Sequence, residues 1–222
     1  MSTTKRVSVH VASDDLGTRL PAFLESLSAQ TFHDWQAVVV DNSGTRSTPT
    51  EPPVYVLRNL RPQSLSRSMS QAMELASGAE FFIMSRGDLV FAPNMLQAML
   101  DAFQKDESLI FAWPSLARAS YDPDSTEGEL LLSDDRVMPT RPEDLSAACV
   151  MIRAQDIGSL RPDPRLGSDL AMQDFLWKFS QTGAKGRQIE EAIAWLQPGA
   201  TLASPGFLRY WTWVWTRRAP RS

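Results

Sequence analysis

The stretch FFIMSRGDLVFAPNMLQAML, residues 81–100, places a strand, a loop and a helix in immediate succession. Its first four residues are an unbroken apolar run, typical of a strand buried on both faces of a parallel sheet. The apolar residues that follow recur at helical spacing and mark one buried face: Leu96, Met99, Leu100 and Phe103. Asp88 lies in the loop between strand and helix, just beyond the carboxyl end of the strand.

The same order of strand, loop and helix recurs on the N-terminal side of this stretch. Apolar and β-branched runs predict strands at 7–11, 37–40, 54–58 and 81–84. Amphipathic spacing predicts helices with apolar faces at 20–27, 65–76 and 96–103. This alternation predicts an α/β fold with a mostly parallel, Rossmann-like sheet that is flanked by helices on both faces.

Residues 114–145 break the alternation, because they are acidic and rich in Pro, Asp and Ser. We expect a long excursion there, and loops of that length in compact domains tend to be functional. Three elements follow it: a return strand at 146–154, an amphipathic helix at 170–183 and a strand at 192–196. The sequence therefore predicts one domain over residues 1–200 and a Trp- and Arg-rich tail over 201–222.

Composition limits the classes of partner. The 222 residues are 43% hydrophobic, enough for a sizeable core, and carry a formal net charge of −4 with a pI of about 5.3. Nucleic-acid phosphates require a basic surface, so we expect no nucleic-acid partner. The single Cys149 lies in AACVMI, which favours a small buried hydrophobe and a reducing compartment. With no run of about 20 apolar residues and no signal-peptide core, we expect a cytoplasmic chain.

Acidic side chains cluster just past the predicted strand ends. Asp14 and Asp15, Asp41 and Asp88 all stand at such positions. Open parallel sheets bind ligands at the carboxyl ends of their strands, so we interpret this pattern as a binding site. The alternative is that Asp, Ser and Gly simply end strands and cap helices there. The coincidence at three strand ends weakens that alternative.

The order of these parts resembles glycosyltransferase family 2, enzymes of the GT-A fold that move a sugar from a nucleotide diphosphate onto an acceptor. The resemblance runs from about Val7 to Leu196, and the family's Asp-x-Asp motif falls on residues 86–88. The segments that carry it are VSVHVASDD (7–15), LPAFLESLSAQTFHDWQAVVVDNSGT (20–45), SRSMSQAMELASGAEFFIM (66–84), GDLVFAPNMLQAML (87–100), AACVMIRAQDIGSL (147–160) and QDFLWKFSQTGAKGRQI (173–189).

The resemblance implies a donor site. Ser13 and Asp41 occupy positions that hold the nucleotide base in the family, the carboxylate accepting from a ring N–H. Asp88 falls on the final carboxylate of the Asp-x-Asp motif, which coordinates a divalent metal that bridges the two donor phosphates. The first carboxylate of that motif is replaced by Arg86. Two further donor-binding residues are expected: Asp15 and Arg67.

The replacement at Arg86 predicts a weakened dependence on Mg²⁺ or Mn²⁺. A hard cation prefers several oxygen ligands, so Asp88 with the phosphates alone would bind it weakly, and Arg86 would repel it. The guanidinium of Arg86 could instead fork onto phosphate oxygens and neutralise the charge that develops on the leaving diphosphate.

The resemblance also implies a catalytic base, which falls on Asp174, with Asp169 as a rival because the alignment needs a small change of length. A carboxylate that is partly buried among apolar neighbours suits a general base in a single displacement that inverts the anomeric centre. The alternative is that Asp174 pairs with Lys178 at i,i+4, a surface contact worth about a few tenths of a kcal/mol.

The tail FLRYWTWVWTRRAPRS, residues 207–222, alternates Trp with Thr and Val and ends in arginines. Its rings could cover the core as a final strand, or one ring could stack on an acceptor sugar. Together with the arginines they could also contact anionic lipid at the inner face of the membrane. The last reading suits a lipid-linked acceptor.

Two functions follow from this reasoning. The first is transfer of a sugar from a nucleotide-sugar donor to a saccharide or lipid-linked acceptor in polysaccharide biosynthesis. The second is a degenerate GT-A domain that binds nucleotide sugars or serves as a scaffold without turnover, which the loss of the first motif carboxylate favours. A nucleotidyltransferase is disfavoured, because no glycine-rich, basic phosphate loop follows the first strand.

Overall fold

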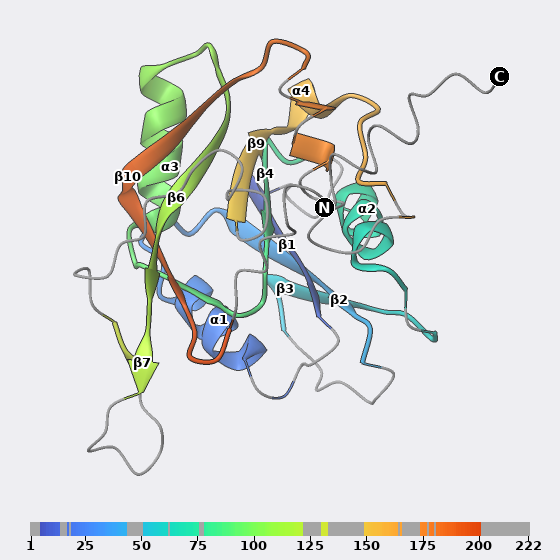
Figure 1. Ribbon diagram of the computed structural model, residues 1–222, viewed down its shortest axis with the longest axis vertical. Helices are drawn as coiled ribbons and strands as arrows, with labels where there is room; N and C mark the ends of the chain where they lie inside the picture. Colours follow the sequence, from blue (N-terminus) through green and yellow to red (C-terminus); the bar gives the residue numbers. More distant parts are fainter. Residues whose placement is uncertain are drawn as a thin grey trace, which may run out of the picture.

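The computed structural model describes residues 5–13, 17, 19–43, 51–61, 63–75, 78–121, 130–132, 149–163, 165, 174–176, 178–179 and 181–200 (Figure 1). The strands are β1 Val7–Ser13, β2 Trp35–Asp41, β3 Val54–Arg58, β4 Phe81–Ser85, β5 Leu89–Phe91, β6 Leu109–Arg118, β7 Ser120–Tyr121, β8 Leu130–Leu131, β9 Cys149–Arg153 and β10 Lys185–Leu196. The helices are α1 Leu20–Ser28, α2 Leu65–Leu75, α3 Met95–Lys105 and α4 Ala154–Ile157. One sheet has the order β3-β2-β1-β4-β9-β6-β10-β5, and β7 pairs with β8 in a second.

Four adjacent strands, β3, β2, β1 and β4, are parallel, as their apolar runs predict. Alternate residues of each strand face two different cores. In β4, Phe81 and Ile83 belong to one core, whereas Phe82 and Met84 belong to the other. Because both faces of the strand are buried, the run FFIM contains no polar residue.

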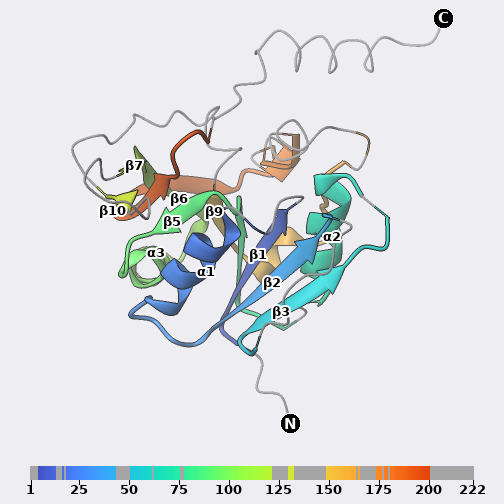
Figure 2. The ribbon, with the colours of Figure 1, turned by 90° about the horizontal axis from the view of Figure 1, so that it is seen from below.

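Helices cover both faces of the sheet, which confirms the predicted α/β arrangement (Figure 2). α1 and α3 pack on one face through apolar residues at helical spacing: Leu20, Phe23, Leu27, Leu96, Met99, Leu100 and Phe103. α2 and the helical residues around Asp174 pack on the opposite face: Met69, Ala72, Met73, Phe175, Leu176 and Phe179. The sheet thus lies between two separate hydrophobic clusters.

The other half of the sheet mixes strand directions. β9 is antiparallel to both β4 and β6, whereas β10 is parallel to β6. The excursion expected from residue 114 begins later than predicted, because β6 continues through Pro114 to Arg118. Proline has no N–H to donate to a neighbouring strand. The pairing of β6 with β9 covers only Phe111 and Ala112, so Pro114 lies beyond it and breaks none of its hydrogen bonds.

β10 is longer than the strand predicted at 192–196. It begins at Lys185, and its register with β6 shifts between Ile189, opposite Pro114, and Ile193, opposite Ser115. Residues 190–192 are therefore accommodated as an irregularity in the strand. Beyond it, Ala194–Leu196 pairs on its other side with β5, a short antiparallel strand that the sequence did not predict.

Cys149 is buried at the start of β9, as expected, and burial raises the pKa of its thiol to about 12. No helix in the described part of the chain has the length and apolar character needed to cross a membrane. Asp15, Asp169 and the tail 201–222 lie outside the described residues, so the predictions that rest on them stay predictions.

Candidate functional site

The carboxyl ends of β1 and β2 bring two predicted site residues side by side. Ser13 and Asp41 are register partners, and the backbone N–H of Asn42 donates to the carbonyl of Ser13 at 2.8 Å. Arg58, the last residue of β3, is the register partner of Asp41 on its other side. The ends of three adjacent strands thus form one polar edge, the place where parallel sheets bind ligands.

Asp41 is fully buried and accepts three hydrogen bonds from described residues. Ser43 donates from its backbone N–H at 2.9 Å and from its hydroxyl at 2.7 Å, and Arg58 donates from Nε at 3.3 Å. Burial alone would raise the pKa of Asp41, but the Ser43 hydrogen bonds and the Arg58 guanidinium lower it below its ordinary value. An ionised carboxylate offers about four acceptor positions, so one more donor, such as a base N–H, can be accommodated once neighbouring side chains make room.

A buried amide and hydroxyl network joins this edge to α2. Asn42 donates to the Ser68 hydroxyl at 2.8 Å and accepts from the Asn59 amide at 2.8 Å. Asn59 also donates to Gln71 Oε1 at 3.2 Å. Because Asn42, Asn59 and Ser68 are buried, breaking one contact leaves a polar group without water, which fixes α2 against the strand ends.

α2 begins beside the same edge. The Ser64 hydroxyl accepts from the Arg67 backbone N–H at 3.3 Å, which is the contact of a helix N-cap. Arg67, one of the predicted donor-binding residues, is exposed in the first turn of α2. Its backbone is therefore fixed near Asn42 and Ser68 while its side chain faces solvent.

The loop after β4 holds the next pair of predicted site residues. Arg86 donates from Nε to Asp88 Oδ1 at 2.8 Å and from Nη2 to Oδ2, a bidentate contact within one loop. Arg19, immediately before α1, brings its Nη1 to 4.0 Å from the same Oδ2. The Asp88 side chain is 11% exposed, so a nearly buried carboxylate lies between two guanidinium groups.

Gln197 connects the Asp88 loop to Arg19. Its side-chain amide donates to the carbonyl of Arg19 at 2.9 Å, and its backbone N–H donates to the carbonyl of Asp88 at 3.0 Å. Sequence reasoning missed both Arg19 and Gln197, because these contacts join segments 178 residues apart. The signal available for Arg19 was its position: a cationic side chain directly before the helix that follows the first predicted strand.

The arrangement around Asp88 does not fit a divalent cation. Both carboxylate oxygens accept hydrogen bonds from Arg86, and Arg19 places a second positive charge beside them. A hard cation requires several oxygen ligands and repels neighbouring cations. Within the described ranges, no group of three or more His, Cys, Asp and Glu side chains could hold a metal ion.

Asp174 lies in a different group of charges. It is 1% exposed, and the ammonium group of Lys178 forms an i,i+4 ion pair with it. Arg165 acts on Asp174 through its charge and binds Asp163 at 2.7 and 2.9 Å. The ion pair with Lys178, predicted as the alternative to a catalytic role, is therefore present, but the Asp174 carboxylate in this pair is buried rather than on the surface.

The predicted site residues thus fall into two places. β1 pairs with both β2 and β4, with Val11 opposite Ser85, so Ser13, Asp41 and the Arg86–Asp88 loop share one edge of the sheet. The helical residues around Asp174 instead pack on the face that α2 covers, because Phe175 belongs to the same hydrophobic cluster as Met69.

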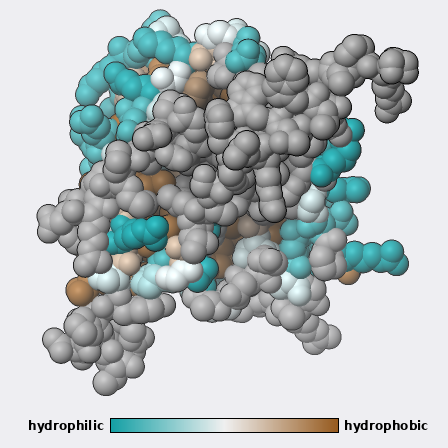
Figure 3. Space-filling view, in the orientation of Figure 1, coloured by the Kyte–Doolittle hydropathy of each residue, from teal (hydrophilic) through white to brown (hydrophobic). Residues whose placement is uncertain are grey.

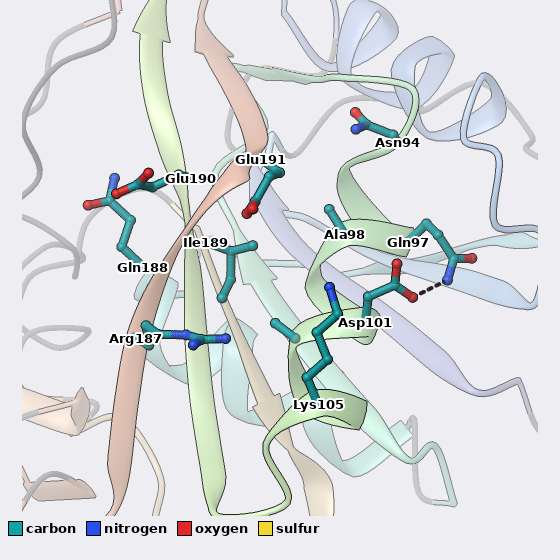
Figure 4. A pocket seen from close by; sticks show the side chains of 11 residues that line it. Asn94, Gln97, Ala98, Asp101, Lys105, Arg187, Gln188, Ile189, Glu190 and Glu191 are labelled. Atoms are coloured by element: carbon teal, nitrogen blue, oxygen red, sulfur yellow. Dashed lines mark hydrogen bonds between the residues drawn. The ribbon is translucent and has the colours of Figure 1, made fainter.

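A polar cavity of about 650 Å³ lies elsewhere, between α3 and β10. Its lining comes from Asn94 and the α3 residues Gln97, Ala98, Asp101, Ala102 and Lys105, and from Arg187 to Glu191 of β10. In Figure 4, Arg187, Ile189 and Glu191 lie on the side of β10 that faces α3, whereas Gln188 and Glu190 lie on its other side. Hydrophilic residues also gather on the surface over α3 and the start of β10, at the upper left of Figure 3. None of the predicted site residues lines this cavity.

Comparison with known proteins bears on the edge of the sheet that carries Asp41 and the Arg86–Asp88 loop. A family model, glycosyl transferase family 2, matches residues 15–127, half of the chain and the part that contains Asp41, Arg86 and Asp88. The chain belongs to glycosyl transferase family 2. No curated protein sequence matches this family member.

Solved structures of GT-A glycosyltransferases share the fold of this family 2 chain. GalNAc-T7 with UDP, GalNAc and Mn²⁺ superposes with a TM-score of 0.61 at 15% identity, covering 92% of this chain and 45% of that one. S. aureus TarS in complex with UDP gives 0.64 at 14% identity, covering 86% and 60%. The mannosyltransferase PcManGT from Pyrobaculum calidifontis, with GDP-Man and Mn²⁺, gives 0.64 at 14% identity, covering 97% and 61%. The chain therefore spans between 45% and 61% of the length of these structures.

Proposed function

We propose that this glycosyl transferase family 2 chain moves a sugar from a nucleotide diphosphate donor to a hydroxyl group of a saccharide or lipid-linked acceptor. The observation that carries the proposal is the shared edge of the sheet. It combines an ionised carboxylate, Asp41, beside Ser13 with the Arg86–Asp88 loop one strand away, where Arg19 adds a second guanidinium group. A base and a diphosphate, joined by a ribose, need a hydrogen-bond acceptor at one end of a site and guanidinium groups at the other.

Each end of the edge has a distinct task. Asp41 accepts a hydrogen bond from the base N–H, and Ser13 lies against the same base. Arg86 and the exposed Arg67 of α2 contact the phosphates, whose negative charge increases as the bond from the sugar to the diphosphate breaks. Stabilising this charge is the main electrostatic contribution that the chain makes to the reaction.

The acceptor hydroxyl loses its proton as its oxygen attacks the anomeric carbon. We assign the base to Asp174, which would take this proton while the new carbon–oxygen bond forms and the nucleoside diphosphate leaves, inverting the anomeric centre. Because Asp174 is 1% exposed and paired with Lys178, acceptor binding must open that pair. Lys178 is 37% exposed and can swing into solvent.

The test is release of nucleoside diphosphate from a panel of UDP- and GDP-sugars, with and without saccharide and lipid-linked acceptors. We expect release to depend on one donor and one class of acceptor. Asp174→Asn should lower its rate by about 10²- to 10⁴-fold without weakening nucleotide binding. Asp163→Asn is the matched control, because Asp163 is a second buried carboxylate of the same charge group. An equal loss in both variants would assign the effect to the charge group rather than to a base.

One observation favours the alternative of a binding module without turnover. Arg86 stands where the family has a carboxylate, and Asp174 is buried in an ion pair. A chain that binds a nucleoside diphosphate but releases none from any donor and acceptor would be such a module. Contact of the tail 201–222 with a membrane surface at the cytoplasmic face is a separate prediction, which flotation with anionic liposomes would test.

A further inference from the structure

We infer that Arg86 and Arg19 together take the place of a divalent cation at the donor diphosphate, and that Asp88 positions these arginines instead of binding a metal. This inference rests on the proposed function, because it concerns the same donor. It changes the expected chemistry of the site from a metal-bridged diphosphate to one held by guanidinium groups.

The first argument is the occupancy of Asp88. Its two oxygens accept from the Nε and Nη2 atoms of Arg86, the planar fork that matches a carboxylate best. A metal ion would have to displace this bidentate contact and then remain close to the released guanidinium. Both steps oppose metal binding, whereas neither opposes an anion that approaches the arginines from the solvent side.

The second argument is the charge balance. Among the side chains that the structure describes at this corner, Asp88 contributes one negative charge and Arg86 and Arg19 contribute two positive charges, so their sum is cationic. The Arg86 and Arg19 side chains are 22% and 39% exposed, compared with 11% for Asp88. An incoming diphosphate therefore meets the guanidinium groups before it meets the carboxylate.

The third argument is the way in which Arg19 is held. Gln197 is buried and binds the carbonyls of Arg19, Asp88 and Leu89, at 2.9, 3.0 and 3.4 Å. This fixes the start of α1 at a constant separation from the Asp88 loop. Gly199 completes the contact, since a Cβ there would come within 3.3 Å of Arg19 Nη2 and its φ of +73° disfavours other residues.

The experiment is calorimetric titration of the full chain with UDP, GDP and inorganic pyrophosphate, once in excess EDTA and once with saturating Mn²⁺. We expect the same affinity for the preferred nucleotide in both conditions. Arg19→Gln and Arg86→Gln should each weaken nucleotide and pyrophosphate binding by about tenfold or more, the size of a lost charge-assisted hydrogen bond. Arg161→Gln is the matched control, because Arg161 is exposed and binds the backbone carbonyls of Gly158 and Leu160.

Folding is controlled with a double variant. Arg86→Gln leaves the buried Asp88 without its partner and could unfold the loop, so Arg86→Gln/Asp88→Asn, which removes one charge of each sign and leaves the net charge of the site unchanged, is compared by thermal melting. We expect the double variant to melt like the wild type and still to bind pyrophosphate weakly. Full binding by a folded double variant would overturn the inference.

Two further outcomes separate the inference from the proposed function. Nucleotide binding that is lost in EDTA and restored by Mn²⁺ would overturn the guanidinium role and leave the transferase proposal intact. Binding of no nucleoside diphosphate in either condition would overturn both. Metal-independent binding that falls in Arg19→Gln and not in Arg161→Gln, with both variants melting like the wild type, supports the inference, because only Arg19 is assigned a contact with the phosphates.

Discussion

The two ends of the proposed donor site differ in how their carboxylates are used. At the base end, Asp41 is surrounded by hydrogen-bond donors that keep it ionised, and Arg58 reaches it at a long 3.3 Å. At the diphosphate end, Asp88 is taken up by the bidentate contact with Arg86. The first carboxylate is arranged as an acceptor for a ligand, and the second as a partner for side chains of its own chain.

This difference shows that the two ends of the proposed site depend on different parts of the fold. The base end rests on the register of β1 and β2 and on the buried network of Asn42, both of which belong to the core of the sheet. The diphosphate end rests on a short loop after β4, where one substitution, Arg86, changes the charge without disturbing a strand. Three changes to the chain can sharpen or break this contrast.

The largest effect is expected from Asp41→Asn. This change replaces a carboxylate, which accepts from the base N–H, by an amide with one acceptor oxygen and one donor NH₂ group. Nucleotide affinity should therefore fall by about a hundredfold, or ~2.7 kcal/mol. Pyrophosphate binding should not change, because pyrophosphate contacts the other end. The lowered pKa of Asp41 predicts equal nucleotide affinity at pH 8 and pH 5. Calorimetry of UDP, GDP and pyrophosphate checks this, and a parallel loss of pyrophosphate binding would show that the two ends are not independent.

The next effect concerns the strand beneath the base end. His10 is fully buried in β1, bonds Ser8 Oγ at 2.9 Å and packs on Phe82, and burial lowers the pKa of His10 to about 3. Below its ordinary pKa of 6.5 the unfolded chain binds a proton that the folded chain does not, so acid favours unfolding. The free energy of unfolding should therefore be about 2 kcal/mol lower at pH 5 than at pH 8 from His10 alone.

Urea denaturation at these two pH values measures this loss, and His10→Gln provides the comparison. The variant carries no titrating group at position 10, so its stability should depend less on pH by about the same 2 kcal/mol. The absolute stability of the variant is irrelevant to this comparison. An unchanged pH dependence would mean that His10 is not held neutral in the core.

The smallest effect tests how much the base end depends on α2. Ser64→Ala removes the acceptor of the Arg67 N–H and should lower the free energy of unfolding by about 1 kcal/mol. Ser70→Ala, within the same helix, is the control, because the Ser70 hydroxyl bonds back to the carbonyl of Ser66 and alanine is the better helix former. Equal losses in urea denaturation would contradict the capping role of Ser64.

The sequence predicted best where a pattern has a local physical cause. FFIM and the apolar run of β2 are buried on both faces, so their composition alone indicates parallel strands. Asp41 and Asp88 were predicted to lie together because parallel strands end at one edge, a rule that needs no knowledge of pairing, and the structure places them at that edge. β6 was not predicted at all, because Pro114 and the acidic residues that follow it suggested a loop, whereas the strand and its ladder with β10 continue to Arg118.

The contacts that sequence reasoning could not supply are those between distant segments. Arg19 matters through its position beside Asp88, and Gln197 through its contacts with three backbone carbonyls that no motif records. The bidentate contact of Arg86 with Asp88 was also not foreseen, because a residue two positions away can point either toward or away from its neighbour. Side-chain direction in loops depends on packing rather than on spacing.

The irregularity at residues 190–192 divides β10 into two parts that make different contacts. The part after Ile193 is bound on both sides, by β6 and β5, and leads directly to Gln197. The part before it carries the wall of the polar cavity beside α3. The register shift thus separates the wall of the polar cavity from the segment that leads to the anchor of Arg19, so a change in one part of β10 need not move the other.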